Sequence, residues 1–578
     1  MSAAGCWWLK GAWLELGLGT AVLQVIERAR RSYHSRAEAQ PLRILTHARE
    51  RLVRKSETLA FLPLFGQMTR PRHLDYYDAD GLNRLTEAPQ AYRAVTLELY
   101  LSDLTRLRVA ESLGRALARC DWRAWYQPGR IVDAHVFYVD MHDKVIWTTK
   151  PSPVGFVSSL HDVHTCLKQT FVHGRGGQAL FCQTFAADVH LNEVVLTVAH
   201  ALDRAIGRPI IQVIVTDREG LSIDVLQALA RENKALVALL KANQYSSEAD
   251  FVRRGRFRQI NDPRTGRATH RVADADFALS PELTVRAALL YDLQQAEHLI
   301  ALITTVSRAQ QPDIRRIVGW YLARWNTQEN SFRAQIAFVQ LNVNFGLRAK
   351  RVVPDRRVAK QIADLSSHAA AVTQKLDHKL AQLAEQASRR QVHDARYARQ
   401  LTELLRPPRR AGALAARRAA QRQQRVQNLQ QRHQQRLLKQ VRYQIKLEQQ
   451  IEAHRQEQTR VAQALTQLDP QAMFFEVDSE KDQIVAHLRI ALHNSALWAR
   501  DHYFSATYRH ATPMTLWRAF FNQDGFYLEL SDRIVITLKP FSNLHVQQEA
   551  VEACRRFNAR QIATLSGKLI EMRIADCI

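Results

Sequence analysis

The sequence lacks the cysteine patterns that mark disulfide frameworks and structural zinc sites. No two cysteines form a C-x-x-C pair, and the six of them are scattered over 578 residues: Cys6, Cys120, Cys166, Cys182, Cys554 and Cys577. Such usage argues against a disulfide-rich secreted scaffold and favours a reducing compartment. We therefore expect a cytoplasmic protein.

Long uncharged apolar runs are also missing. The most apolar stretch, residues 3–25, is interrupted by Lys10 and Glu15, and its apolar residues recur at helical spacing. A membrane-spanning helix needs roughly 20 consecutive apolar residues. The pattern therefore favours an amphipathic core helix over a signal peptide or a spanning helix, and we expect no membrane partner.

Two common catalytic signatures are absent. The glycine-rich stretch Gly174–Gly177 lacks the Gly-Lys-Ser/Thr of a phosphate-binding loop, and no serine stands in a Gly-x-Ser-x-Gly setting. Nucleotide hydrolysis by a phosphate-binding loop and acyl transfer by an activated serine are therefore not indicated.

Acidic residues are scarce relative to basic ones. The chain has 81 Lys and Arg against 56 Asp and Glu, a formal charge of +25. Such an excess favours a polyanionic partner, because each neutralised phosphate releases condensed counterions. Nucleic acid is the favoured partner, although a membrane surface or a ribosome would also attract such a chain.

Hydrophobic periodicity and composition predict an α/β protein built from six segments. A β-rich insertion interrupts the expected core, and a long basic arm follows it. The segments are a helical N-terminal domain with candidate DNA-binding faces (1–125), the first part of an RNase H-like core (126–241), the β-rich insertion (242–310), a catalytic helix completing the core (311–355), a basic helical arm (356–470) and a small α+β C-terminal domain (471–578).

The order of elements within 126–241 carries the core prediction. We expect strands at 130–139, 144–149, 179–185, 209–216 and 235–240, and helices at 192–206 and 222–233. Three antiparallel strands followed by helix, strand, helix and strand are the order of an RNase H-like sheet.

The arm is rich in Arg, Gln and Ala and carries an apolar stripe. Val426, Leu429, His433, Leu437 and Val441 recur every three or four residues, which predicts a helical hairpin or a coiled coil. We interpret this stripe as a homodimer contact. Basic residues on the other faces are expected to hold the DNA backbone with little sequence readout: Arg425, Arg432, Arg436 and Lys439.

Three acidic residues stand where an RNase H-like sheet supplies metal ligands. Asp133 is expected in the first strand, Asp217 directly follows the fourth strand, and Glu329 lies in the later helix. Phosphodiester cleavage and strand transfer use two divalent ions about 4 Å apart. Two Mg²⁺ or Mn²⁺ ions fit, because such hard ions prefer carboxylate oxygens.

Each of these carboxylates also has a structural interpretation. Asp133 fits a turn or edge carboxylate, Asp217 fits a cap for the helix near residue 222, and Glu329 fits an ion pair with Arg333 on its own helix. Glu219 competes with Asp217 as a ligand. The ordered placement of three acids on separate elements favours the metal site.

The blocks around these acids resemble DDE transposases of bacterial insertion sequences, members of the RNase H-like and retroviral integrase superfamily. The matching stretches are Val132-Asp-Ala-His135, Thr216-Asp-Arg-Glu-Gly-Leu-Ser222 and Tyr321-Leu-Ala-Arg-Trp-Asn-Thr-Gln-Glu-Asn-Ser-Phe-Arg333, with a further stretch at 481–489. The resemblance implies a transposase that cleaves DNA at transposon ends and joins them to target DNA. It implies Asp133, Asp217 and Glu329 as catalytic metal ligands.

The resemblance also implies contacts with double-stranded DNA near the site, from Tyr321, Arg324, Arg333 and Lys241. One spacing departs from the pattern. The best-known related group places its glutamate one residue closer to the arginine, where this chain has Gln328, with a lysine seven residues beyond. Neither Gln335 nor Ile336 supplies that lysine, so we assign its role to Arg333.

Two other functions fit the same residues. The chain could be a catalytically inactive DNA-binding remnant of a transposase, or an RNase H-like DNA nuclease without strand transfer. Metal-dependent cleavage separates the first from a transposase, and joining of a pre-cut 3′ hydroxyl end separates the second.

Overall fold

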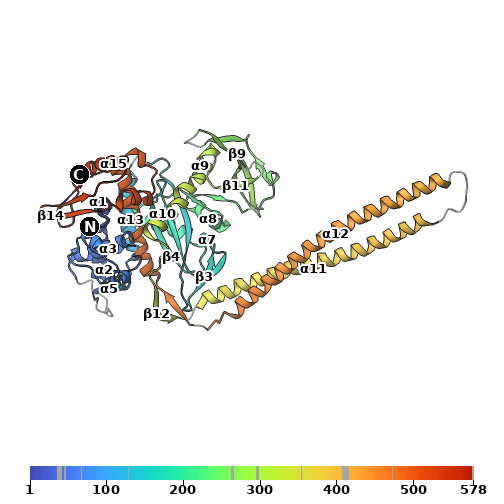
Figure 1. The fold of residues 1–578 in the computed structure, drawn as a ribbon, viewed down its shortest axis with the longest axis horizontal. Helices are drawn as coiled ribbons and strands as arrows, with labels where there is room; N and C mark the ends of the chain where they lie inside the picture. The colour runs from blue at the N-terminus through green and yellow to red at the C-terminus, as the bar shows by residue number, and fades with distance from the viewer. Residues whose placement is uncertain are drawn as a thin grey trace. The chain divides into compact units, whose positions relative to one another are not determined.

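A large mixed β-sheet surrounded by helices dominates the fold (Figure 1). The computed structural model describes residues 1–34, 42–43, 47–66, 68–127, 129, 131–241, 243–261, 266–294, 298–352, 355–406, 415–471 and 473–575. Over these residues the chain divides into two compact units, one of Met1–Lys350 with Phe475–Ile578, the other of Arg351–Phe474. The mixed α/β class is as predicted.

The strands of the chain are β1 (Val136–Val145), β2 (Val154–Val157), β3 (Asp162–His173), β4 (Ala179–Phe185), β5 (Val213–Thr216), β6 (Ala235–Leu239), β7 (Phe251–Arg253), β8 (Arg258–Asn261), β9 (Ala268–Ser280), β10 (Leu283–Asp292), β11 (Leu299–Thr304), β12 (Leu347–Val352), β13 (Phe474–Val477), β14 (Gly525–Glu529), β15 (Arg533–Leu538) and β16 (Leu569–Ile574). Among the described residues, eleven strands form one sheet in the order β2-β3-β1-β5-β6-β11-β10-β9-β7, with β4 on β3 and β8 on β9. A three-stranded sheet, β14-β15-β16, is separate.

The direction of the central strands fixes which residues share an edge. β1 runs antiparallel to β3 and parallel to β5, and β5 runs parallel to β6. The insertion then joins the same sheet, because β11 pairs antiparallel with β6. The carboxyl ends of β1, β5 and β6 therefore lie along one edge.

Strand prediction succeeded at β4 and β6, missed β2 and β3, and misplaced β1. β4 matches the strand expected at 179–185, and β7 to β11 lie within the expected β-rich insertion at 242–310. β1 begins at Val136 rather than near residue 130 and continues to Val145. The predicted separate strand at 144–149 is wrong, since Lys144 and Val145 end β1 and the antiparallel partner is β3. The polar run 140–144 is strand rather than turn.

The α-helices are α1 (Trp7–Glu15), α2 (Leu18–His34), α3 (Arg49–Phe61), α4 (Asp80–Leu85), α5 (Ala94–Leu107), α6 (Ala110–Trp125), α7 (Leu191–Ile206), α8 (Ile223–Arg231), α9 (Ile314–Arg324), α10 (Asn330–Val339), α11 (Asp355–Leu405), α12 (Ala415–Thr466), α13 (Ser479–Tyr503), α14 (Pro513–Leu516) and α15 (Leu544–Asn558). Local chemistry explains several of their starts. The Ser222 side chain accepts from the Val225 N–H at the start of α8, and Glu193 accepts from the His190 N–H before α7.

The N-terminal helices and the C-terminal segment share one hydrophobic core. Trp7, Trp8 and Trp13 of α1 are fully buried in a cluster that includes residues of α13 and β15. Lys10 donates to Glu57 at 2.6 Å, and both side chains are fully buried. Lys10, which interrupts the apolar run 3–25, is thus paired inside the core.

Among the described helices, no single one is long and apolar enough to cross a bilayer. The bent pair Ala4–Glu15 and Leu18–Tyr33 meets the length and composition criteria only when its two members are taken together.

The arm folds as a helical hairpin in which α11 and α12 lie side by side and antiparallel (Figure 1). Gln458 donates to Thr373 at 3.1 Å, and Gln386 donates to the Gln440 carbonyl at 3.0 Å. On α12 the first four residues of the predicted stripe are half-buried, from Val426 to Leu437, whereas Val441 is exposed. The predicted basic contacts are exposed: Arg425, Arg432, Arg436 and Lys439.

Candidate active site

Two acidic residues lie at the level where β5 ends, Asp140 in the middle of β1 and Asp217 directly after β5. Tyr138 pairs with Val215 in the parallel register. Asp140 stands two residues after Tyr138, and Asp217 stands two residues after Val215. Because the strands are parallel, both side chains reach the edge where ligand sites of such sheets form. Asp140 was missed by sequence reasoning, which placed it in a turn.

A π-helical turn between α9 and α10 positions the third acid. The turn spans Trp325–Glu329, and the Asn330 N–H donates to the Trp325 carbonyl five residues earlier. In an α-helix a residue five positions on is rotated by about 140°, whereas in a π-helix it returns to nearly the same face. Glu329 therefore faces Arg324, with 3.2 Å between its Oε1 and the Arg324 Nη2.

The same turn explains the departure in spacing. Gln328, which stands where the related signature has its glutamate, is fully buried. Because the π turn holds one extra residue, Glu329 rather than Gln328 faces Arg324. Such turns are frequent at functional sites.

Arg324 lies among the three carboxylates. Its Nη2 donates to Asp140 Oδ2 at 2.6 Å, and the two side chains are only 12% and 13% exposed. Burial opposes the charged guanidinium, but Asp140, Asp217 and Glu329 outweigh burial and raise the pKa of Arg324 above its usual value. In this structure Arg324 is therefore engaged with carboxylates, and its expected contact with DNA stays a prediction.

The carboxylates repel one another. Burial raises the pKa of Asp140 to about 7; the Arg324 charge lowers it, while Asp217 and Glu329 raise it. A site with three acids on separate elements matches the oxygen donors that hard divalent ions prefer. Among the described residues these three acids do not gather within 4.8 Å of one another. Binding one ion therefore requires Arg324 to withdraw and the acids to close in.

Asp133 does not join this group. It stands in the turn before β1 with a left-handed φ of 57°, and it accepts hydrogen bonds from Arg316 and, at 2.7 Å, from Trp320 Nε1. A residue before β1 and a residue after the parallel β5 stand at opposite edges, about 13 Å apart for four strand residues. In this structure Asp140, rather than Asp133, lies near Asp217 and Glu329.

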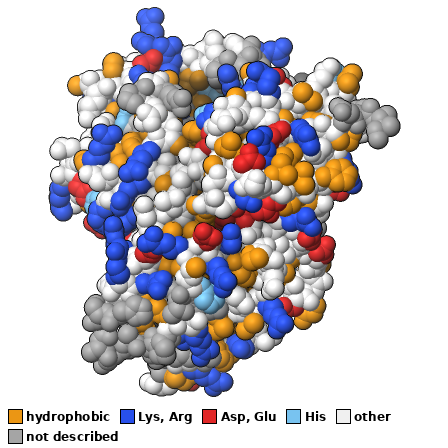
Figure 2. Space-filling model, turned by 90° about the vertical axis from the view of Figure 1, so that its left-hand side faces the viewer, with side chains coloured by type: hydrophobic (Ala, Val, Ile, Leu, Met, Phe, Trp, Pro, Cys, Tyr) orange, Lys and Arg blue, Asp and Glu red, His pale blue; other side chains and the backbone are white. Residues whose placement is uncertain are grey.

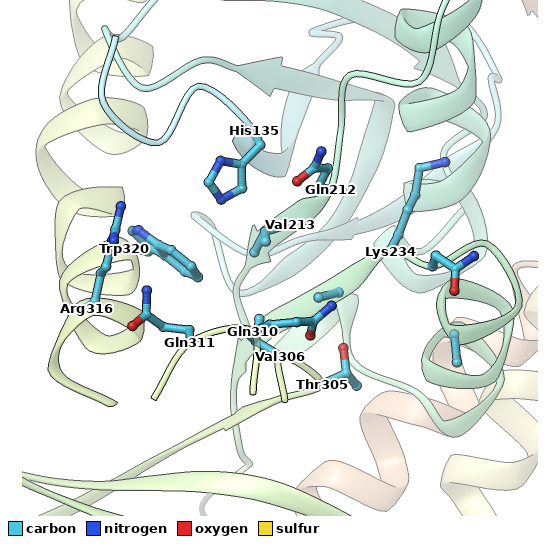
Figure 3. Close-up of a pocket in the computed structure, with 13 residues that line it drawn as sticks. His135, Gln212, Val213, Lys234, Thr305, Val306, Gln310, Gln311, Arg316 and Trp320 are labelled. Carbon is cyan, nitrogen blue, oxygen red and sulfur yellow. The ribbon is translucent and has the colours of Figure 1, made fainter. Parts of the chain in front are cut away.

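The partners of Asp133 line a separate pocket at the amino end of β5 and β6. Arg316 and Trp320 reach into it from α9, and Lys234 stands across from them, around a volume of about 620 Å³ (Figure 3). Asp133 therefore orients a pocket wall, which agrees with the structural interpretation of this residue.

The remaining predicted residues surround the carboxyl edge. Burial and the nearby Asp217 raise the pKa of Glu219, whose N–H donates to Asp217 Oδ1 at 2.8 Å. Lys241 is exposed just after β6. Arg333 lies over the ring of Trp325 at 5.3 Å, and burial raises the pKa of the half-buried Tyr321.

The block at 481–489 supports β1 from α13. Asp482, 1% exposed, accepts from the Lys144 ammonium at 2.8 and 2.9 Å and from the Gln169 amide at 3.0 Å. This buried pair fixes the strand that presents Asp140. Sequence reasoning included the block in the resemblance but found no role for Asp482.

One face of the molecule carries side chains of both charges (Figure 2). On the face shown in Figure 2, Lys and Arg side chains are scattered, with several acidic side chains near the middle. The charge of +25 therefore does not by itself nominate a DNA groove on this face.

Comparisons with known proteins establish no family. No family model matches the chain, and no curated protein matches it. Among solved structures, the piggyBac transposase synaptic complex with hairpin DNA matches with a TM-score of 0.28 and 8% identity. The match covers 57% of this chain and 66% of that chain, just under two thirds. A likeness this low carries no functional argument.

Proposed function

We propose that the protein is a metal-dependent DNA transposase whose ions are held by Asp140, Asp217 and Glu329. The observation that carries the proposal is the arrangement of these acids around Arg324, from β1, the end of β5 and the π turn. When bound, two Mg²⁺ or Mn²⁺ ions activate the attacking oxygen and stabilise the leaving oxygen of the phosphodiester.

The sheet supports this proposal. The order β4-β3-β1-β5-β6, with β1 parallel to β5 and β6, is the order of an RNase H-like sheet. β7 to β11 then intervene before α9, in agreement with a core interrupted by a β-rich insertion. The acids stand at the edge where parallel strands of such sheets present ligands.

In this proposal Arg324 holds the acids together until DNA and metal arrive. Its guanidinium neutralises Asp140 and Glu329, and the same fork geometry suits a phosphate. Release of Arg324 toward the backbone frees the acids for the ions. Lys241 and Arg333, both exposed, then add phosphate contacts beside the site.

The test compares acid-to-amide variants of the full chain. Purified protein is incubated with Mn²⁺ or Mg²⁺ and DNA carrying the sequences that flank its gene, and cleavage is measured. We expect Asp140→Asn and Glu329→Gln to lose about a hundredfold or more, since each ligand contributes several kcal/mol to transition-state stabilisation. Asp133→Asn is the matched control and should stay within a few-fold of the parent.

The reverse ranking, with Asp140→Asn active and Asp133→Asn inactive, would overturn the assignment. Two further outcomes decide between functions. A parent protein that binds DNA, but neither binds Mn²⁺ nor cuts DNA, is a catalytically inactive remnant. A parent that cuts but never joins a pre-cut 3′ hydroxyl end is a nuclease.

A further inference from the structure

The helical hairpin holds a cluster of two histidines and an aspartate far along the chain from the acids of β1 and β5. His393 and Asp394 belong to α11, and His433 belongs to α12. One ligand atom from each lies within 4.8 Å of the other two, the only such group among the residues that the structure describes. Asp394 Oδ1 is 3.9 Å from both His393 Nδ1 and His433 Nε2.

Several polar atoms of the cluster are buried without hydrogen-bond partners. They are His393 Nδ1, Asp394 Oδ1 and His433 Nδ1. The two histidine side chains are only 22% and 16% exposed. Buried polar atoms are normally satisfied by a partner. His393 Nδ1 and Asp394 Oδ1 lie 3.9 Å apart without one, and His433 directs its Nε2 at the same Oδ1.

Ring packing fixes the orientation of these side chains. The His433 ring stacks on Tyr397 with centroids 3.8 Å apart and planes within 3°. The His393 ring lies parallel to the His433 ring, with the planes within 2° and the ring centroids 5.5 Å apart. Arg390 Nε lies 3.8 Å from Asp394 Oδ2, which leaves Oδ1 directed at the imidazoles.

We propose that His393, Asp394 and His433 bind a divalent transition-metal ion, Zn²⁺ being the best match, which clasps α11 to α12. Imidazole nitrogen and carboxylate oxygen bind Zn²⁺ at about 2.0–2.2 Å. Ligand atoms around a tetrahedral ion at such distances stand about 3.4 Å apart. The two 3.9 Å distances to Asp394 Oδ1 need shifts of a few tenths of an ångström, and the third pair of ligand atoms closes from within 4.8 Å. A water molecule would take the remaining position.

This site differs chemically from the acids around Arg324. Two nitrogen donors favour Zn²⁺ over Mg²⁺, which prefers oxygen donors and retains its waters. The clasp would stiffen the hairpin on which the exposed arginines of α12 are mounted. It does not depend on the proposed DNA cleavage.

Hydrogen–deuterium exchange on the full chain tests the clasp, with peptides covering 386–441 followed with no metal, with Zn²⁺ or with Mg²⁺. In the parent we expect Zn²⁺ to slow amide exchange about tenfold or more around the cluster, and Mg²⁺ to have no effect. His433→Gln and Asp394→Asn should both abolish the Zn²⁺ effect. The matched control is His378→Gln. His378 belongs to α11, as Asp394 does, but is hydrogen-bonded to Gln382 at 3.0 Å, and this variant should retain the Zn²⁺ effect.

The clasp is refuted if Zn²⁺ leaves the parent unchanged, or if the variants are protected as well as the parent. The same holds if His378→Gln loses protection to the same degree. Should His433→Gln exchange rapidly without metal, Asp394→Asn decides, because it preserves size and both stacked rings. The Asp140→Asn protein should keep full Zn²⁺ protection, which separates this proposal from the transposase proposal.

Discussion

The buried pair between Lys144 of β1 and Asp482 of α13 offers the sharpest test of how the site is held. Both residues are 1% exposed, and burial lowers the pKa of Lys144 below its usual value. Asp482→Asn leaves the ammonium group without its counter-charge. Removing one partner of a buried ion pair costs about 3–5 kcal/mol, because the remaining charge stays desolvated.

That cost converts into a melting shift. The unit containing both residues, Met1–Lys350 with Phe475–Ile578, has about 450 residues. At about 2.1 cal/mol/K per residue its unfolding entropy is about 1 kcal/mol/K. Asp482→Asn should therefore lower the Tm of this unit by about 3–5 °C in calorimetry of the full chain.

Two controls isolate the burial effect. Lys568→Met breaks the exposed pair with Glu529 (2.7 Å apart) and should move the Tm by less than about 1 °C. Replacing both buried partners, with Lys144→Met and Asp482→Leu, should recover part of the loss, because no unpaired charge remains while the Gln169 amide and the Phe345 N–H lose their acceptor. An Asp482→Asn protein that melts within 1 °C of the parent would refute the reasoning.

Three further predictions concern pH, spacing and salt. Burial raises the pKa of Asp121 from 3.8 to about 8, so the folded state binds more protons than the unfolded state between these values. Stability should fall as pH rises from 5 to 7, by up to about 1.4 kcal/mol per unit in urea unfolding, and Asp121→Asn should flatten that slope. The double variant Gln328→Glu with Glu329→Gln moves the glutamate to the position it has in the related signature. It should lose Mn²⁺ binding in titration as fully as Glu329→Gln alone, because residue 328 faces the core. Retained Mn²⁺ binding would contradict the role of the π turn. Four basic residues of the arm are replaced by Gln: Arg425, Arg432, Arg436 and Lys439. This change should reduce the slope of log K against log[salt] for DNA binding by about 3–4, measured by fluorescence anisotropy. An unchanged slope would remove the arm from the interface.

Local signals in the sequence were enough for many elements. β4, β10, β11 and the hairpin of β14 and β15 follow short apolar runs bounded by turn residues. α8 starts where Ser222 caps it, and most of the stripe of α12 is half-buried. These features depend on neighbours a few residues away, and the sequence therefore determines them by itself. The same holds for Asp217, whose place after β5 follows from the strand that precedes it.

The face of Glu329 needed the structure, because spacing alone does not reveal a π turn. An α-helix through residues 324–329 would turn Glu329 away from Arg324 and direct Gln328 toward it. The fold selects the other arrangement, with Gln328 in the core and the acid beside Arg324 and Asp140.

Only the tertiary structure decided the first acid of the site. The run 140–144, Asp-Met-His-Asp-Lys, has the composition of a turn, yet it forms the second half of β1. Its charges are tolerated in a sheet because partners from distant segments neutralise them: Asp140 meets Arg324, Asp143 meets Lys168, and Lys144 meets Asp482. A charge can be buried only when it is paired, and those partners stand 25 to 338 residues away.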